Sequence, residues 1–354
     1  MIKNAQLVAA VMMLSSQVAK IASQRILMDS KLVVQIVALQ CKRIVLHVAI
    51  VAVRELCKLL IKLNKDKQIN KLELQENPIL LKHDYQIIDQ KPKAGAFGTV
   101  IFARHTKKGN SVAVKQLDYR SADQKSKVDQ EYKLMKEAFR TMKKALPSDS
   151  FIPLVQPIDF LTSDDRNQAF LILEYCSKGD MRDQIKEMRQ RGMKMGEEMC
   201  LVYIGEIASA LNLMHKNKII HADLKPENVL FTEDYKVKLT DFGLACRLHD
   251  GKEYVTMIGG TQESCITTAV DIWALGVIIY ELLALVHPFS HGKANPNSLQ
   301  IVFSVRDEPP SKFPEGFSKD LEKLIMRMLE KDQTRRITAE QILAVPEVAA
   351  KLRR

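Results

Sequence analysis

The stretch IIHADLKPENVL, residues 219–230, contains the most informative group of charged and polar residues in the chain. After two isoleucines it places an aspartate, a lysine and an asparagine within six residues. Asp223 could accept a proton from a hydroxyl group, and Lys225 could neutralise negative charge that develops beside it. Asn228 could supply an amide oxygen to magnesium, a hard cation that prefers oxygen ligands. The stretch therefore has the composition of a loop for phosphoryl transfer.

A second acidic group follows thirteen residues after Asn228, in LTDFGLA at residues 239–245. Asp241 stands where an apolar strand gives way to a loop, and Gly243 makes that loop flexible. We expect Asp241 to be the second magnesium ligand. Either aspartate alone could be an ordinary surface residue, but the order and spacing of these groups argue against coincidence.

Upstream, KAGAFGTV at residues 93–100 predicts a glycine-containing turn between two strands. Such a turn lets backbone N–H groups approach phosphate oxygens, although glycine turns also join many ordinary hairpins. VAVK, residues 112–115, places Lys115 on the following strand. Its ammonium group could neutralise phosphate charge or could simply be solvated.

Glu131 lies sixteen residues after Lys115, in a stretch with helical spacing. If that helix packs on the sheet, Glu131 can hold Lys115 by an ion pair. Glu137 competes for this role, but Glu131 is followed three and four residues later by leucine and methionine, which form an inward apolar stripe. The pattern favours Glu131.

The order of the elements predicts an α+β fold with two lobes. From about Tyr85 apolar and polar residues alternate, which indicates antiparallel strands, whereas beyond Gly179 the spacing becomes mostly helical. Strands followed by helices imply a small antiparallel sheet lobe, a larger helical lobe and a cleft between them. The expected boundaries are 1–75 for an N-terminal helical extension, and 85–175 and 176–350 for the two lobes of the main domain.

Composition limits the expected partners and location. Residues 1–67 carry +8 of the net charge of +11, so the main domain does not require a nucleic-acid partner. Six widely spaced cysteines, without a C-x-x-C pair, predict reduced thiols in a cytoplasmic or nuclear protein. The longest apolar runs near the start are too short for a transmembrane segment.

Residues 1–75 are basic and apolar and contain no glycine or proline. This composition predicts helices that pack on each other or on the main domain. A mitochondrial presequence, a membrane-surface helix and a helix that docks a partner or inhibits the domain are the alternatives.

Residues 85–350 resemble a eukaryotic protein kinase catalytic domain of the serine/threonine type. The resemblance covers about three quarters of the chain. It implies a two-lobed protein kinase-like fold that uses ATP and Mg²⁺ to phosphorylate serine and threonine hydroxyls of a protein substrate. The alternative is an ATP-binding pseudokinase that acts as a scaffold or regulator. The matching motifs are G-x-F-G-x-V at 95–100, V-A-V-K at 112–115, H-x-D-L-K-P-E-N at 221–228, D-F-G at 241–243 and D-I-W-A-L-G at 271–276.

The resemblance also implies roles for the residues already singled out. Lys115, held by Glu131, contacts the α- and β-phosphates of ATP. Asp223 is the catalytic base, and Lys225 stabilises the transferring phosphoryl group. The metal ligands are Asn228 and Asp241.

The nucleotide site follows from the same resemblance. In LILEYCSKGDM, residues 171–181, Leu173 is the gatekeeper at the back of the adenine site. The other implied nucleotide-binding residues are Gly95, Ala96, Phe97 and Gly98 in the phosphate loop, Val100, Ala113 and Leu230 around adenine, Glu174 and Cys176 through backbone groups, Asp180 near the ribose, and Glu227.

Two departures from the family pattern leave the predicted chemistry in place. Lys93 replaces the first glycine of the phosphate loop, which stiffens the loop but keeps its other two glycines. Ala222 replaces the arginine that in this family grips a phosphate on the activation loop. We therefore expect activity that does not depend on phosphorylation of the hydroxyl residues available there, which are Tyr254, Thr256 and Thr261.

A third departure affects the substrate platform, because the A-P-E motif is missing. Only nine residues separate Thr261 from Asp271. In the family the lost glutamate pairs with an arginine that here matches Arg336. We therefore expect a buried Arg336 without a partner, a less stable helical lobe and weakened binding of peptide substrates.

Overall fold

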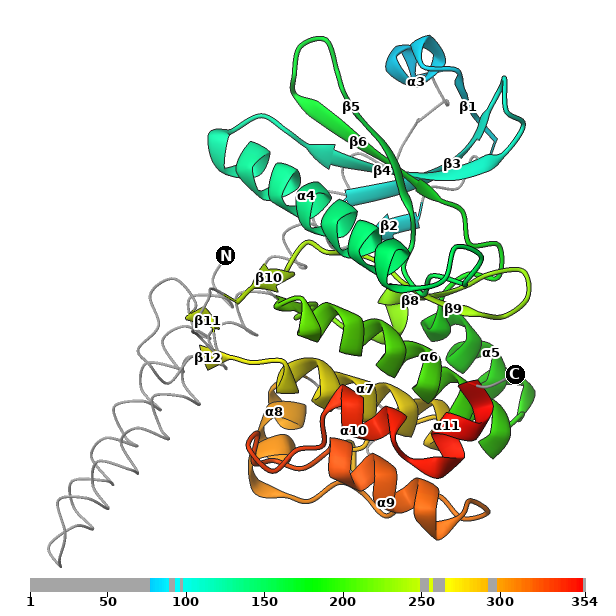
Figure 1. The fold of residues 1–354 in the computed structure, drawn as a ribbon, viewed down its shortest axis with the longest axis vertical. Helices are drawn as coiled ribbons and strands as arrows, with labels where there is room; N and C mark the ends of the chain where they lie inside the picture. Colours follow the sequence, from blue (N-terminus) through cyan, green and yellow to red (C-terminus); the bar gives the residue numbers. More distant parts are fainter. Residues whose placement is uncertain are drawn as a thin grey trace, which may run out of the picture. The chain divides into compact units, whose positions relative to one another are not determined.

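The computed structural model describes residues 77–88, 93–95, 98–248, 255–256, 265–291 and 298–352 (Figure 1). The predicted helical extension, residues 1–75, lies outside the described residues. The chain divides into two compact units, and the larger one comprises residues 71–255, 266–294 and 308–354. The described helix of the smaller unit is α8 (Ser298–Asp307). The following paragraphs concern the larger unit.

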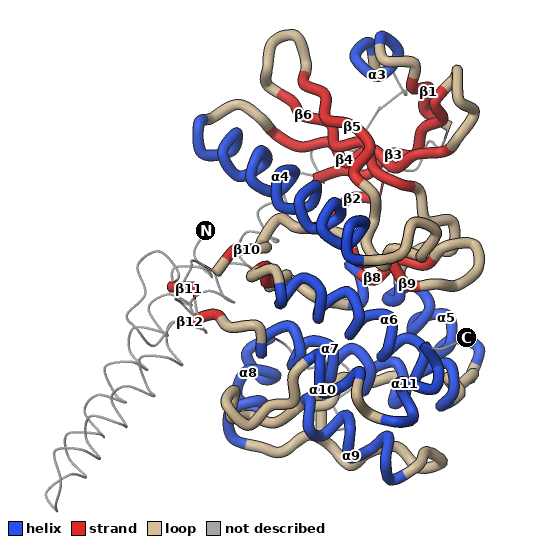
Figure 2. Tube along the Cα trace, viewed as in Figure 1, coloured by secondary structure: helices blue, strands red, loops and turns tan. Residues whose placement is uncertain are grey.

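The first part of this unit is a twisted antiparallel sheet, drawn in red in Figure 2. Its strands run in the order β1-β3-β4-β6-β5, and β2 also pairs with β3. Neighbouring strands are antiparallel throughout, as the alternating sequence predicted. The strands are β1 (Tyr85–Ile87), β2 (Lys93–Gly95), β3 (Gly98–His105), β4 (Ser111–Asp118), β5 (Pro157–Thr162) and β6 (Gln168–Glu174).

Successive side chains of a strand point to opposite sides of the sheet. In this sheet the side chains on both sides are packed against other elements. On β4, Val112 and Val114 enter a small core shared with helix α3 (Pro78–Lys82). On the other face, Leu117 of β4 and Leu171 of β6 join the main core together with residues of helix α4 (Ala122–Ala145). Two-sided burial explains why β6 is apolar nearly from end to end.

Helix α4 begins at Ala122, nine residues before Glu131, around which the sequence predicted a helix. Ser121 caps the helix: its hydroxyl accepts from the N–H of Gln124, and the Gln124 side chain accepts from the N–H of Ser121. This capping box satisfies donors that the first turn would otherwise leave unpaired. The helix ends at Ala145, two residues before Pro147. Its buried residues recur at helical spacing and are Val128, Glu131, Leu134, Met135, Ala138 and Met142.

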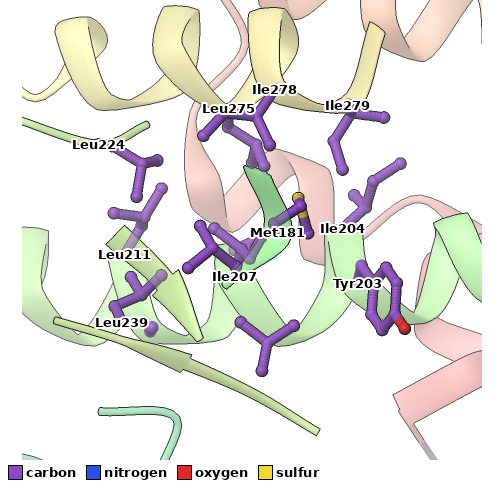
Figure 3. Close-up of a cluster of buried hydrophobic side chains, with 14 of the residues drawn as sticks. Met181, Tyr203, Ile204, Ile207, Leu211, Leu224, Leu239, Leu275, Ile278 and Ile279 are labelled. Carbon is purple, nitrogen blue, oxygen red and sulfur yellow. The ribbon is translucent and has the colours of Figure 1, made fainter. Parts of the chain in front are cut away.

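The second part of the unit is helical. Figure 3 shows the α6 side chains Ile204, Ile207 and Leu211 packed towards α7, which contributes Leu275 and Ile278. All of them are fully or almost fully buried, and they form the centre of the main core. The helices are α5 (Met181–Arg191), α6 (Glu197–Lys216), α7 (Ala269–Ala284), α9 (Lys319–Met328), α10 (Ala339–Leu343) and α11 (Pro346–Leu352).

Gly276 sets the distance between α7 and α9. A Cβ atom at this position would lie 2.8 Å from the Cβ of Met328, closer than two such carbons approach. The glycine therefore lets α9 pack directly on the α7 backbone. Together with the sheet, this helical lobe confirms the predicted α+β architecture.

Four short strands place the loops between the lobes. They are β7 (Ile219–Ile220), β8 (Val229–Phe231), β9 (Val237–Leu239) and β10 (Cys246–Arg247). β8 and β9 form a hairpin, and β7 pairs with β10. Residues 221–228 therefore lie between two short anchored strands. Two further described strands are β11 (Val255–Thr256) and β12 (Cys265–Ile266), and no described helix has the length and apolar character needed to cross a membrane.

Arg336 corrects one prediction. It is buried as expected, with 9% of its surface exposed, but it does not lack partners. Its guanidinium donates to the carbonyl oxygens of Glu330 at 2.8 Å, Ala269 at 2.6 Å and Lys331 at 3.3 Å. The same group lies 4.9 Å from the ring centre of Trp273. A planar group with five donors can satisfy itself on carbonyls that converge from two chain segments.

These carbonyls replace the missing carboxylate only in part. Burial lowers the pKa of Arg336 to about 10, although Glu330 and Asp332 act in the opposite direction. The side chain therefore remains charged at neutral pH. The bond to Ala269 fixes the start of α7 to the segment before α10, which is the connection that the A-P-E glutamate would otherwise reinforce.

We predict that Arg336→Lys destabilises the protein by about 2 kcal/mol, because one ammonium group cannot reach all three carbonyl oxygens or stack on Trp273. Denaturant unfolding and the Tm measure the effect. Arg335→Lys is the matched control, since Arg335 is an exposed neighbour. Equal stability of the two variants would show that the carbonyl cluster does not hold α7.

Candidate active site

A buried carboxylate at the start of α7 shapes the loop at residues 221–228. Asp271 is 1% exposed and accepts hydrogen bonds from the backbone N–H groups of His221 and Ala222, both at 2.9 Å. The Nε2 atom of His215 on α6 lies 2.8 Å from the same carboxylate. Ala222 has a φ of 59°, a left-handed conformation that costs a residue with a Cβ some free energy. The two bonds to Asp271 offset that cost and hold the turn just before Asp223.

Asp223 is contacted by Lys225 and Asn228, which follow it in the same loop. The Nζ atom of Lys225 lies 2.5 Å from its carboxylate. The side-chain nitrogen of Asn228 donates to the Asp223 carbonyl at 2.7 Å and to its carboxylate at 3.2 Å. Residues Pro226–Asn228 form a short 3-10 helix, η1, which brings Asn228 back onto Asp223. The structure therefore places these three predicted residues in one group.

A second charged group joins the sheet, α4 and the end of β9. The Nζ atom of Lys115 lies 2.7 Å from the Glu131 carboxylate and 2.9 Å from the Asp241 carboxylate. Glu137, the competing candidate, instead pairs with Arg247. Lys115 and Glu131 are both buried. Three residues separated by up to 126 positions in the sequence thus meet in one place.

Burial and pairing oppose each other in this group. Burial alone would lower the pKa of Lys115, but the carboxylates of Asp241 and Glu131 outweigh it and raise that pKa. Burial works against ionisation of Asp241 as well, but Lys115 and the Gly243 N–H keep the pKa of Asp241 below its usual value. Burial raises the pKa of Glu131 despite its bond to Lys115. Lys115 therefore carries a positive charge and Asp241 a negative one at neutral pH.

His221 links the two groups. Its Nε2 atom lies 3.0 Å from the carbonyl oxygen of Thr240, the residue before Asp241. Its ring also packs against Phe242, with 5.3 Å between ring centres. Asp241 itself has a φ of 66°, so its backbone turns sharply where β9 ends. The contacts of His221 fix this turn relative to the loop that carries Asp223.

The register of the sheet places several predicted nucleotide-binding residues on one face. Lys115 lies opposite Val100 of β3, and Ala113 lies opposite Leu173 of β6. Opposed residues share a face, and so do residues two apart on one strand. Val100, Ala113, Lys115 and Leu173 therefore line the same side of the sheet as the ion pair with Glu131. Val100 and Ala113 are only partly buried there.

The phosphate-loop prediction falls partly outside the described residues, which exclude Ala96 and Phe97. Gly95 and Gly98 are paired at the turn end of the β2–β3 hairpin, one on each side of residues 96 and 97. Gly98 has a φ of 147°, and a Cβ there would lie 2.4 Å from the carbonyl oxygen of Gln116. Only glycine fits this position.

Three further predicted nucleotide-binding residues lie at the end of β6 and in the segment after it, whereas Glu227 lies in η1 and Leu230 in β8. Glu174 is the last residue of β6, and Cys176 is buried two residues later. Burial raises the pKa of the Cys176 thiol to about 12, so the thiol stays protonated. The Asp180 side chain caps α5 by accepting from the N–H of Asp183 at 2.9 Å. Asp180 also forms an isolated antiparallel β-bridge with Leu230. This bridge ties the start of α5 to the β8–β9 hairpin.

Sequence reasoning did not assign roles to two residues that organise this region. Asp271 was noted only as part of D-I-W-A-L-G, and Arg182 was not singled out. An acidic residue at the start of a strongly apolar helix is a usable signal for Asp271, because such a charge must be buried with donors. Arg182 pairs with Glu227 and Glu281, which lie 45 and 99 residues away, so no local pattern marks it.

Comparisons with known proteins agree with this arrangement. The family model of the protein kinase domain matches residues 93–346. An Aurora kinase of Candida glabrata is 31% identical over 292 residues, which cover 80% of this chain and 74% of the relative. A SNF-related serine/threonine-protein kinase of Homo sapiens is 32% identical over 273 residues, which cover 72% of this chain.

A carbon catabolite-derepressing protein kinase of Secale cereale is 30% identical over 263 residues, which cover 70% of this chain. The matched regions span 32% of the human relative and 48% of the rye relative, so these proteins contain long segments without a counterpart here. The shared part is the kinase domain. Because the family match extends over most of the chain and coincides with the sheet, the helical lobe and the loops between them, the chain belongs to the eukaryotic protein kinase family, and its relatives include serine/threonine kinases.

Proposed function

We propose that residues 85–350 form an active serine/threonine kinase domain that transfers the γ-phosphoryl group of ATP to protein hydroxyls. The observation that carries the proposal is the position of Lys115 between Glu131 and Asp241, at 2.7 and 2.9 Å. Burying an ammonium group between two carboxylates costs desolvation free energy, so such a group contributes little to stability. Its presence is better explained by binding of a charged ligand. The serine/threonine assignment rests on the lysine of D-L-K-P-E-N and on the relatives.

The residues fit ATP with magnesium. Asn228 uses its side-chain nitrogen in its bonds to Asp223, which leaves the amide oxygen as a hard donor for the cation. Asp241 is the second oxygen donor, and Lys115 is placed to contact the phosphates. Bound magnesium neutralises phosphate charge. The phosphate loop with Gly95 and Gly98, together with Val100, Ala113, Leu230 and the segment from Glu174 through Cys176 to Asp180, would hold the rest of the nucleotide.

Asp223 would act as the base. Its carboxylate is oriented by Asn228, and it would accept the proton of the attacking serine or threonine hydroxyl as the new oxygen–phosphorus bond forms and the bond between the γ-phosphorus and the departing ADP oxygen breaks. The Nζ atom of Lys225, 2.5 Å from that carboxylate, would also offset the charge of the transferring phosphoryl group. The contribution of the protein is thus positioning and charge neutralisation.

The alternative is a pseudokinase that binds ATP as a scaffold or regulator. It is favoured by the nine residues between Thr261 and Asp271, which leave little chain for a substrate platform. For either function we propose a cytoplasmic or nuclear protein with a protein substrate or partner, without a role in nucleic-acid binding. Residues 1–75 are the candidate docking or autoinhibitory segment.

We predict that the wild type transfers labelled phosphate from ATP·Mg²⁺ to a basic protein, and that Asp223→Ala lowers kcat by about 10²- to 10⁴-fold because the base is lost. Lys115→Met removes the phosphate contact and should abolish transfer. Lys133→Met, an exposed lysine on α4, is the control and should leave activity unchanged. If the wild type binds nucleotide through Lys115 but transfers nothing, the domain is a pseudokinase.

A second prediction concerns regulation. Ala222 cannot grip a phosphate, so the variant Tyr254→Phe/Thr256→Ala/Thr261→Ala should keep wild-type kcat. Phosphatase treatment of the wild type should likewise change nothing. A tenfold or larger loss in the triple variant, matched by the phosphatase-treated wild type, would mean that another cation takes the place of the missing arginine.

A further inference from the structure

Arg182 bridges two carboxylates that belong to different elements. It lies in the first turn of α5, and its Nε atom donates to Glu227 at 2.9 Å. Its Nη1 atom donates to Glu281 of α7. Glu281 is buried, with 9% of its side chain exposed, whereas the side chain of Glu227 is 46% exposed. One guanidinium thus joins α5, η1 and α7.

The partner in the loop is placed where it can influence Asp223. Glu227 is the middle residue of η1, between Lys225 and Asn228. The Lys225 ammonium and the Asn228 amide both contact Asp223, and the Asn228 N–H donates to the Lys225 carbonyl at 2.9 Å. A displacement of Glu227 would therefore move both groups that orient the base.

Helix α7 holds the loop at both ends. Asp271, in its first turn, binds the backbone at residues 221 and 222 directly. Glu281 lies ten residues further along, which is about 15 Å at 1.5 Å per residue. It reaches the other end of the loop through Arg182. A rigid, buried helix thus supplies two fixed points for the eight residues between β7 and β8.

We propose that Arg182 is a positioning residue for phosphoryl transfer, which holds η1 so that Lys225 and Asn228 keep Asp223 in its reactive orientation. The proposal rests on the kinase function proposed above. Arg182 acts through Glu227, since the contacts of its guanidinium are with the Glu227 and Glu281 carboxylates. A displacement of about 1 Å in such a group lowers a rate by up to about a hundredfold, because reacting atoms must be aligned.

If Arg182 had a purely structural role, its loss would lower stability and activity together. Substitution of the buried Glu281 distinguishes this role from the proposed one. Arg182→Met leaves that carboxylate buried without its cation, so both stability and activity should fall. Arg182→Met/Glu281→Met removes the buried charge and fills the space with apolar atoms, which should recover most of the Tm. In the double variant η1 still lacks the contact between Arg182 and Glu227, although Asp271 continues to hold the start of the loop.

The test compares kcat, KM for ATP and Tm for wild type, both variants, Arg182→Lys and the control Arg191→Met. Arg191 lies on the same helix and pairs with the exposed Glu187. We expect the double variant to show a near-wild-type Tm, a KM for ATP within about twofold and a kcat lowered about 10- to 100-fold. Arg182→Lys should be intermediate, since an ammonium group reaches one carboxylate at a time. A kcat that recovers together with the Tm would overturn the proposal.

Amide hydrogen exchange decides the matter without activity. The N–H of Asn228 should exchange at least tenfold faster in the double variant than in wild type, while the N–H groups of α6 and those in Arg191→Met stay unchanged. A wild type that transfers no phosphate would refute the kinase function, but the exchange rates would still report on Arg182. Unchanged exchange at Asn228 would refute the tether.

Discussion

The structure depends on the constraint that buried charges must be paired. Lys115 satisfies it by joining Glu131 from α4 and Asp241 from the end of β9, at 2.7 and 2.9 Å. Removing three charges from water costs several kcal/mol for each ion, and only close pairing offsets that cost. The group can therefore form only when the sheet, α4 and the β9 turn are all in place. Formation of the site therefore depends on formation of the fold.

The same constraint explains why α7 is the scaffold of the helical lobe. It is strongly apolar and buried on most sides, yet it carries Asp271 and Glu281. Each carboxylate is compensated by donors from neighbouring segments: backbone N–H groups of residues 221 and 222 for Asp271 and the Arg182 guanidinium for Glu281. Gly276 brings α9 close on another side. The helix is thus fixed by packing, and its charges transmit that fixed position to the loop.

Loss of the A-P-E motif shows how the fold tolerates a missing partner. Arg336 keeps its buried place because carbonyl oxygens of Ala269, Glu330 and Lys331 converge on it and Trp273 covers its flat face. Burial lowers the pKa of Arg336 to about 10, although Glu330 and Asp332 act in the opposite direction. The start of α7 is nevertheless anchored. The groups around Asp223 keep their own hydrogen bonds, which do not involve Arg336.

The sequence by itself determined the α+β class, the antiparallel sheet, the main helices and the residue types of the site. These follow from periodicity and from motifs whose spacing is local, such as the loop at 221–228. Only the tertiary structure decided which charges meet. It brought Asp241 onto Lys115, gave Arg336 its carbonyl partners, and joined Arg182 to Glu227 and Glu281. Pairing over tens of residues depends on the angle and register at which elements pack, and a one-dimensional pattern does not contain that information.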